Sequence, residues 1–194
     1  MRFAEPLSAE PAQAVPCDLL LVDTRVAESG LPAPRTCKRQ FLKWLSSLPS
    51  GRAHCIVCAT NSAALDVVSS LSDFSGPVAA HRSLYELYRD IDVLHTPGNG
   101  VIRLNGRWPA SGVVLVPAAA FYSLPFMPRD GLHIAHAGPG RAFPDYAEAH
   151  FRFGEREDLK GLLEFARATG TTRVALGPRC EKNTAVAFER TGFT

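Results

Sequence analysis

The sequence predicts an α/β fold, with a mostly parallel sheet and helices on both faces in three αβα layers. Several segments are short, continuous apolar runs, such as LLLV at 19–22, HCIVCA at 54–59 and VVLV at 113–116. Continuous runs are typical of strands buried on both faces, as in parallel sheets. Segments with apolar residues at helical spacing follow most of these runs. Strands that alternate with helices favour a parallel sheet covered on both sides.

The first half of the chain begins with the strand at 19–22, which Asp23 closes. Thr36 is placed to cap a helix that runs to about Leu48, because apolar residues recur there at helical spacing. The strand at 54–59 is followed by a helix capped by Thr60 or Asn61. A short strand at 78–80 then precedes a helix led by Ser83.

The second half carries a turn signal at Asn105-Gly106, which predicts a small hairpin between 101–104 and Trp108. A helix over 118–126 is expected after the strand at 113–116. Gly170 is the natural end of a helix that starts near Asp158. The remaining expected strands are 133–137, 151–153 and 173–176, and the last expected helix is 185–190.

Size and composition are those of an ordinary globular protein, with 194 residues, 46% of them apolar and 21% charged. We expect residues 1–16, rich in Pro and Ala, to form a flexible arm and 17–194 to form a single α/β domain. The net charge of +2 creates no global basic field, so any nucleic-acid binding has to be local. Five cysteines without a secretory signal, and no membrane-length apolar run, predict an intracellular protein (cytoplasmic or nuclear) with free thiols.

The order of segments resembles one family. The segments that carry the likeness are CDLLLVDTRVAESGLP (17–32), GRAHCIVCATNSAALDVVSSL (51–71), GPVAAHRSLYELYRDIDV (76–93), VVLVPAAA (113–120), HIAHAGPG (133–140) and FRFGEREDLKGLLEFARATGTTRVALGPR (151–179). Together they resemble the second half of a metallo-β-lactamase-fold nuclease of the β-CASP type. Bacterial ligase-associated DNA exonucleases and mRNA 3′-end processing factors are the nearest likeness. The resemblance implies that a β-CASP insertion begins near residue 51 and that the chain later returns to the lactamase sheet.

The departures from this family fall on its metal ligands. The family carries a His-x-His-x-Asp-His cluster in its first half, and residues 1–16 contain no His. Where the family has a ligand His, this chain has Arg156, and the family's Thr-His-Gly reads Gly177-Pro178-Arg179. Arginine stays protonated and cannot bind a metal ion. The resemblance therefore implies the fold without the chemistry: no catalytic residue, no metal site and no cofactor. Three acidic remnants are Asp23, Glu155 and Asp158.

Four basic residues are the candidate nucleic-acid-binding site: Arg152, Arg156, Arg179 and Lys182. Arg152 and Arg156 end or follow one predicted strand, and Arg179 and Lys182 follow the next. The carboxyl ends of strands form the ligand crevice of an open parallel sheet. The four residues could form a phosphate-binding patch. A solvated charge cluster neutralised by neighbouring glutamates explains the same pattern, and both interpretations stay open.

Other candidates have stronger structural explanations. Cys55 and Cys58 point to opposite faces of one strand, as do His133 and His136, so neither pair can chelate a metal from its own strand. Gly138-x-Gly140 is a turn rather than a phosphate cradle, because the third Gly of that motif is missing. The aromatic side chains Phe121, Tyr122 and Phe126 are expected to pack in the core.

The hypothesis from sequence is a catalytically degenerate β-CASP-like module in DNA repair or RNA processing. It would act without enzymatic activity, with a protein partner such as a catalytic nuclease homologue or with single-stranded nucleic acid, and without a membrane. One alternative is an acetyl-CoA-dependent N-acetyltransferase-like enzyme, because the segment from 162 to Phe193 also resembles the end of that family. Another is one half of a two-chain metal-dependent nuclease.

Overall fold

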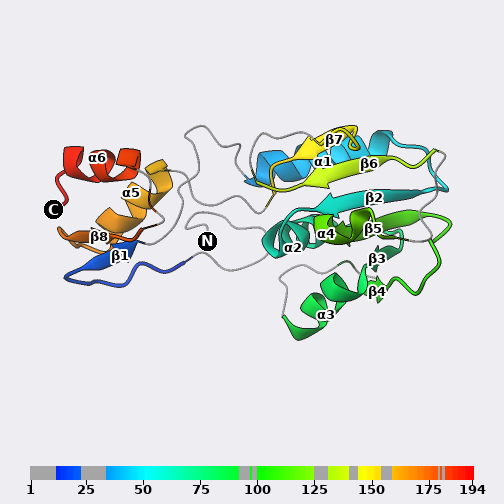
Figure 1. Ribbon diagram of the computed structural model, residues 1–194, viewed down its shortest axis with the longest axis horizontal. Helices are drawn as coiled ribbons and strands as arrows, with labels where there is room; N and C mark the ends of the chain where they lie inside the picture. Colours follow the sequence, from blue (N-terminus) through cyan, green and yellow to red (C-terminus); the bar gives the residue numbers. More distant parts are fainter. Residues whose placement is uncertain are drawn as a thin grey trace. The chain divides into compact units, whose positions relative to one another are not determined.

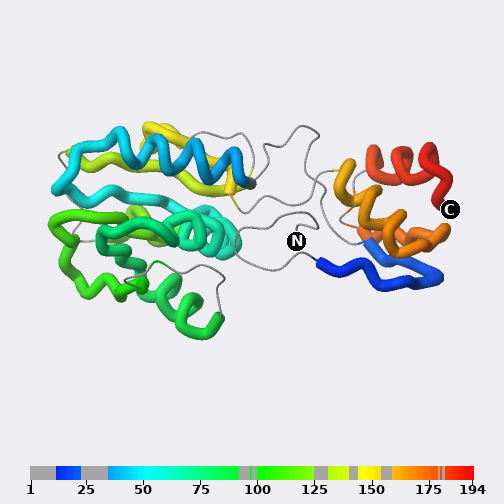
Figure 2. The backbone as a smooth tube through the Cα atoms, turned by 180° about the vertical axis from the view of Figure 1, so that it is seen from behind, coloured from blue at the N-terminus to red at the C-terminus, as the bar shows by residue number. Residues whose placement is uncertain are grey.

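The computed structural model describes residues 12–22, 34–91, 97, 100–124, 131–139, 144–153, 159–178, 180 and 182–194. Contacts divide the chain into two compact units (Figure 1). The terminal unit combines Glu10–Leu31 with Arg156–Thr194, and the central unit is Pro32–Glu155. In Figure 2 the chain runs from the blue segment of the terminal unit through the central unit and then returns to the terminal unit, whose last segments are orange and red. The single domain expected over 17–194 stays a prediction.

The central unit contains a six-stranded sheet in the order β4-β3-β5-β2-β6-β7. All of its described strand pairs are parallel. The strands are β2 (Ala53–Cys58), β3 (Val78–Ala80), β4 (Val101–Arg103), β5 (Gly112–Pro117), β6 (Ile134–Ala137) and β7 (Ala149–Phe151). The predicted class, α/β with a mostly parallel sheet, is confirmed.

Helices cover the two faces of this sheet unequally. The side chains of α1 (Pro34–Ser47), α2 (Asn61–Ser70) and α3 (Arg82–Asp90) pack into one core with Ile56 and Cys58. The four-residue α4 (Ala118–Phe121) packs into a second core with Cys55 and Val57. Because successive residues of β2 face opposite cores, the strand reads as a continuous apolar run. This is the three-layer arrangement that such runs predict.

Local signals in the sequence set the helix starts and anchor the helices. The predicted cap Thr60 precedes α2, and its hydroxyl oxygen accepts a hydrogen bond from the backbone N–H of Ala63 at 3.1 Å. The Tyr88 hydroxyl on α3 donates to the carbonyl oxygen of Ala64 on α2. Gly112, with φ of +104°, opens β5 where an added Cβ would collide with the carbonyl oxygen of Pro77.

The terminal unit is built on two parallel strands, β1 (Leu20–Val22) and β8 (Val174–Leu176), with helices α5 (Leu159–Ala168) and α6 (Lys182–Arg190). Its core contains Val22, Leu162, Ala166, Phe188 and Phe193. The predicted helix end at Gly170 is confirmed by its φ of +71°. The expectation that β1 is buried on both faces is wrong. Leu20 and Val22 contact this core, whereas Leu21 between them is 70% exposed.

The predicted hairpin around Asn105-Gly106 is also wrong. Segment 101–103 forms β4, which pairs in parallel with β3, and Trp108 lies outside any strand. Gly106 still provides a turn with φ of +69°, but the pairing partner of β4 is a strand more than twenty residues earlier. Among the described residues, no helix is long and apolar enough to span a bilayer.

Removal of the Phe41 side chain should strongly destabilise the central unit. Phe41 on α1 is fully buried and packs edge-on against Phe151 and Phe153. Phe41→Ala should lower the free energy of unfolding by about 3–5 kcal/mol. Ile102→Ala, at a 52% exposed position on β4, should cost less than about 1 kcal/mol. Urea unfolding followed by tryptophan fluorescence measures both, because Trp44 and Trp108 lie in the central unit. Equal losses for the two variants would contradict this packing.

Candidate functional site

A pocket of about 180 Å³ lies at the carboxyl ends of strands in the central unit. His81 directly follows β3, Leu104 follows β4, and Leu124 comes after β5 and α4. The N–H of His81 donates to the carbonyl oxygen of Leu115 on β5, and the N–H of Leu104 donates to that of Ala80, both at 2.8 Å. The sheet hydrogen bonds thus continue to the rim and fix two of the lining residues.

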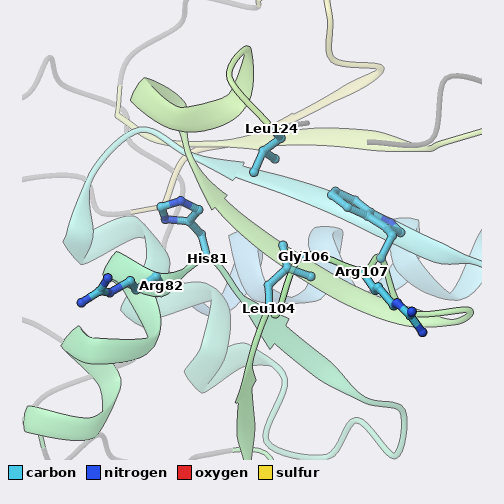
Figure 3. A pocket seen from close by; sticks show the side chains of 7 residues that line it. His81, Arg82, Leu104, Gly106, Arg107 and Leu124 are labelled. Atoms are coloured by element: carbon cyan, nitrogen blue, oxygen red, sulfur yellow. The ribbon is translucent and has the colours of Figure 1, made fainter. Parts of the chain in front are cut away.

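The polar groups of this pocket are His81, Arg82 and Arg107. His81 is the N-cap of α3, and its Nδ1 accepts a hydrogen bond from the N–H of Ser83. This acceptor role places the ring proton of a neutral His81 on Nε2, where it remains a donor. Arg82 pairs with Glu86 one turn along α3 at 2.8 Å. Figure 3 shows Arg82 and Arg107 directed to opposite sides of the pocket.

The remaining walls of the pocket are apolar, formed by Leu104, Leu124 and the indole of Trp108. The indole Nε1–H of Trp108 is buried and has no hydrogen-bond partner within the described part of the chain. A buried donor without a partner costs roughly 1–3 kcal/mol. The pocket therefore offers hydrogen-bond donors and positive charge beside a flat aromatic surface, and its described lining residues include no carboxylate.

Four histidines form two further groups in the central unit. His133 pairs with Glu148 at 2.8 Å, and its ring lies 5.6 Å from that of His54. His136 on β6 and His150 on β7 are register partners whose Nδ1 atoms lie 2.9 Å apart. Within the described residues, no group of three or more His, Cys, Asp or Glu side chains is arranged to hold a metal ion.

Burial depresses the pKa of two of these histidines. The pKa of His54 is lowered mainly by burial and also by the nearby His133. The pKa of His136 is lowered by burial and by His150. Removal from water penalises the charged form, so burial favours the neutral form of both rings.

The four predicted nucleic-acid-binding residues are only partly within the described structure. Arg152 follows β7 in the central unit and is half-buried, whereas Lys182 is the exposed first residue of α6 in the terminal unit. Arg156 and Arg179 lie outside the described residues, as do Asp23, Glu155 and Asp158. The patch stays a prediction.

The prediction that Cys55 and Cys58 point to opposite faces of one strand is confirmed. The prediction that three aromatic side chains pack in the core is partly wrong. Cys55 and Cys58 are buried in different cores, and burial raises the pKa of Cys55 to about 12 and raises that of Cys58 as well. Phe121 is buried as expected, but Tyr122 is 82% exposed because the chain turns at the end of α4. Phe126 and Gly140 lie outside the described residues.

Comparison with known proteins leaves the chain without an assigned family. No family model matches it. No curated protein matches it either.

Sequence reasoning missed the pocket because its lining comes from three separate segments. One signal was present: His81-Arg82 directly follows a buried strand and opens a helix. Residues in that position lie at the carboxyl edge of a parallel sheet, where ligands bind.

The central unit should become less stable as the pH drops below about 6.5. The folded-state pKa of His54 and His136 is lowered, so below 6.5 the unfolded chain binds more protons than the folded one. The stabilisation is complete above the unfolded pKa and is lost as the pH falls through the folded pKa. Urea unfolding at about pH 7.5 and about pH 5.5 should show this decrease, and His54→Gln should reduce it. The same decrease in that variant would contradict the assignment.

Proposed function

We propose that this chain is a catalytically degenerate β-CASP nuclease-like module that binds single-stranded nucleic acid and a protein partner. The division into units supports the family part of this proposal. The central unit is inserted between the two segments of the terminal unit. The sequence resemblance implies that layout, with a β-CASP insertion that leaves the lactamase sheet and later returns to it.

The non-enzymatic part of the proposal rests on the sequence. Arg156 occupies the position of a ligand His of the family, and Gly177-Pro178-Arg179 replaces Thr-His-Gly. A guanidinium repels a divalent cation and cannot coordinate it. A two-metal hydrolysis needs both ions clamped beside the scissile phosphate. These substitutions favour a binding role over nuclease chemistry.

The pocket in the central unit carries the nucleic-acid part of the proposal. The Nε2–H of His81 and the guanidinium of Arg107 can donate to phosphate oxygens, and Trp108 can stack against a base. The Arg107 side chain is exposed, so a phosphate can reach its guanidinium. A base can enter such a recess only after it leaves its stack, which favours a single strand over a duplex. With a net charge of +2, the protein depends on local contacts of this kind.

Arg107→Gln should weaken the binding of a single-stranded DNA or RNA oligonucleotide. Removal of one phosphate contact should lower the slope of log affinity against log salt by about 1. Arg39→Gln is a matched control, since Arg39 is an exposed arginine on α1, away from the pocket. Fluorescence anisotropy over a series of salt concentrations measures the slopes. Equal slopes for the two variants would refute the assignment of Arg107.

The same titration has an internal optical reporter. Base stacking on Trp108 should quench its fluorescence, so Trp108→Phe should abolish the oligonucleotide-dependent change. Trp44→Phe is the control, because Trp44 on α1 packs against Phe41 and Phe151 in the other core. Binding that leaves Trp108 emission unchanged would place the strand elsewhere on the protein.

The protein-partner part of the proposal is supported by the terminal unit. Its described sheet has two strands, fewer than an independently stable sheet needs. Leu19 and Leu21 of this unit are 50% and 70% exposed. Apolar side chains grouped at a strand surface often mark a protein interface. We infer that a catalytic nuclease homologue covers them.

Leu21→Lys should therefore disrupt co-purification with a catalytic β-CASP nuclease expressed in the same cells. The added charge would have to be buried at the interface, which is unfavourable. Thr172→Lys, at an exposed position in the same unit, should leave the association intact. If the Leu21→Lys protein co-purifies as well as the unmodified one, this surface is not the interface.

A further inference from the structure

The facing histidines His136 and His150 form a feature that the proposed function does not use. They occupy opposite positions in the β6–β7 strand pair. Their rings are nearly parallel, with centroids 5.0 Å apart and planes inclined by 18°. The two Nδ1 atoms lie 2.9 Å apart. Because each ring presents the same nitrogen to the other, both side chains direct a potential ligand atom to one point.

These two side chains are held in place from several directions. His136 is buried, pairs in register with Val57 of β2, and has the Tyr146 ring 6.3 Å away. His150 is half-buried. Strand pairing fixes the backbone of His136 on both sides, through β2 and β7, and that of His150 through β6, so the sheet brings the two residues opposite each other.

The protonation of this pair suits ligand binding. A hydrogen bond between two Nδ1 atoms requires one of them to carry a proton and the other a lone pair. Neutral imidazole is the form that binds metals. If the protonated Nδ1 transfers its proton to Nε2 of the same ring through solvent, both Nδ1 lone pairs face one point.

We propose that His136 and His150 form a two-imidazole site for a divalent transition-metal ion such as Zn²⁺ or Ni²⁺. Zinc–imidazole bonds of about 2.0–2.1 Å at a tetrahedral angle place the two nitrogens about 3.3 Å apart. The observed 2.9 Å is short of this separation by about 0.4 Å. Binding of an ion therefore requires the two rings to separate by about this amount as the ion replaces the direct hydrogen bond between them.

The chemistry of the ligands selects the class of metal. Imidazole suits zinc, copper and nickel, whereas Mg²⁺ and Ca²⁺ prefer oxygen ligands. The described residues add no third His, Cys, Asp or Glu ligand to this pair. Two protein ligands leave coordination positions for water or for an oxygen of a second molecule, so the bound ion should be exchangeable.

Calorimetric titration of the full chain, prepared without a polyhistidine tag, tests this site. Zn²⁺ and Ni²⁺ should bind at one equivalent, and Mg²⁺ should not compete. His150→Gln should weaken binding by at least the roughly 10-fold loss that outer-shell changes cause at metal sites. His81→Gln is the matched control and should bind the metal as the unmodified protein does.

Paramagnetic Ni²⁺ locates the ion independently of affinity. It should broaden the NMR signals of residues on β6 and β7 first, and His150→Gln should remove this local broadening. His136→Gln could destabilise the fold because His136 is buried, so the half-buried His150 is the primary target. Broadening centred on His81 or Cys180, or equal affinity in His150→Gln, would overturn the proposal. Neither measurement uses nucleic acid, so the result is independent of the proposed function.

Discussion

The central unit depends on the double pairing of β2. This strand pairs with β5 on one side and β6 on the other, and all six of its residues are buried. Removal of six consecutive residues from water is possible only where both backbone edges and both faces are satisfied. The neighbouring strands β5 and β6 satisfy the backbone edges of β2, and the two cores cover its faces. Every other strand of the unit takes its register from this pairing, directly or through β5 and β6.

This constraint also explains which parts of the fold could be predicted from the sequence. HCIVCA and VVLV have to be apolar throughout because they are interior strands, and they were found at nearly their observed bounds. Thr60 and Gly170 could be placed because capping is a local property of the backbone. The partner of a strand is a long-range property. For that reason the turn at Asn105-Gly106 predicted a hairpin, whereas β4 pairs with β3.

The candidate site was less predictable than the fold for the same reason. Along their own strand, the spacing of His133 and His136 argues against chelation. The relevant neighbour of His136 is His150, fourteen residues later and in register on the next strand. The pocket likewise draws His81, Arg107 and Leu124 from three segments. Cross-strand register cannot be read from residue spacing, because it depends on the order of strands in the sheet.

The unequal covering of the two sheet faces explains the positions of the pocket and of the His136–His150 pair. Three helices cover one face, and their side chains Phe41, Val68 and Leu84 are fully or nearly fully buried in the core against it. The other face carries the four-residue α4 and loop residues. His136 contacts Tyr146 on that side, and Tyr146 lies 4.6 Å from Phe121 of α4. The pocket residues Leu104, Trp108 and Leu124 pack into the same core. A face covered by loops and one short helix leaves polar side chains within reach of a ligand. Binding in the central unit is therefore expected on the α4 side, with the carboxyl ends of the strands as its entrance.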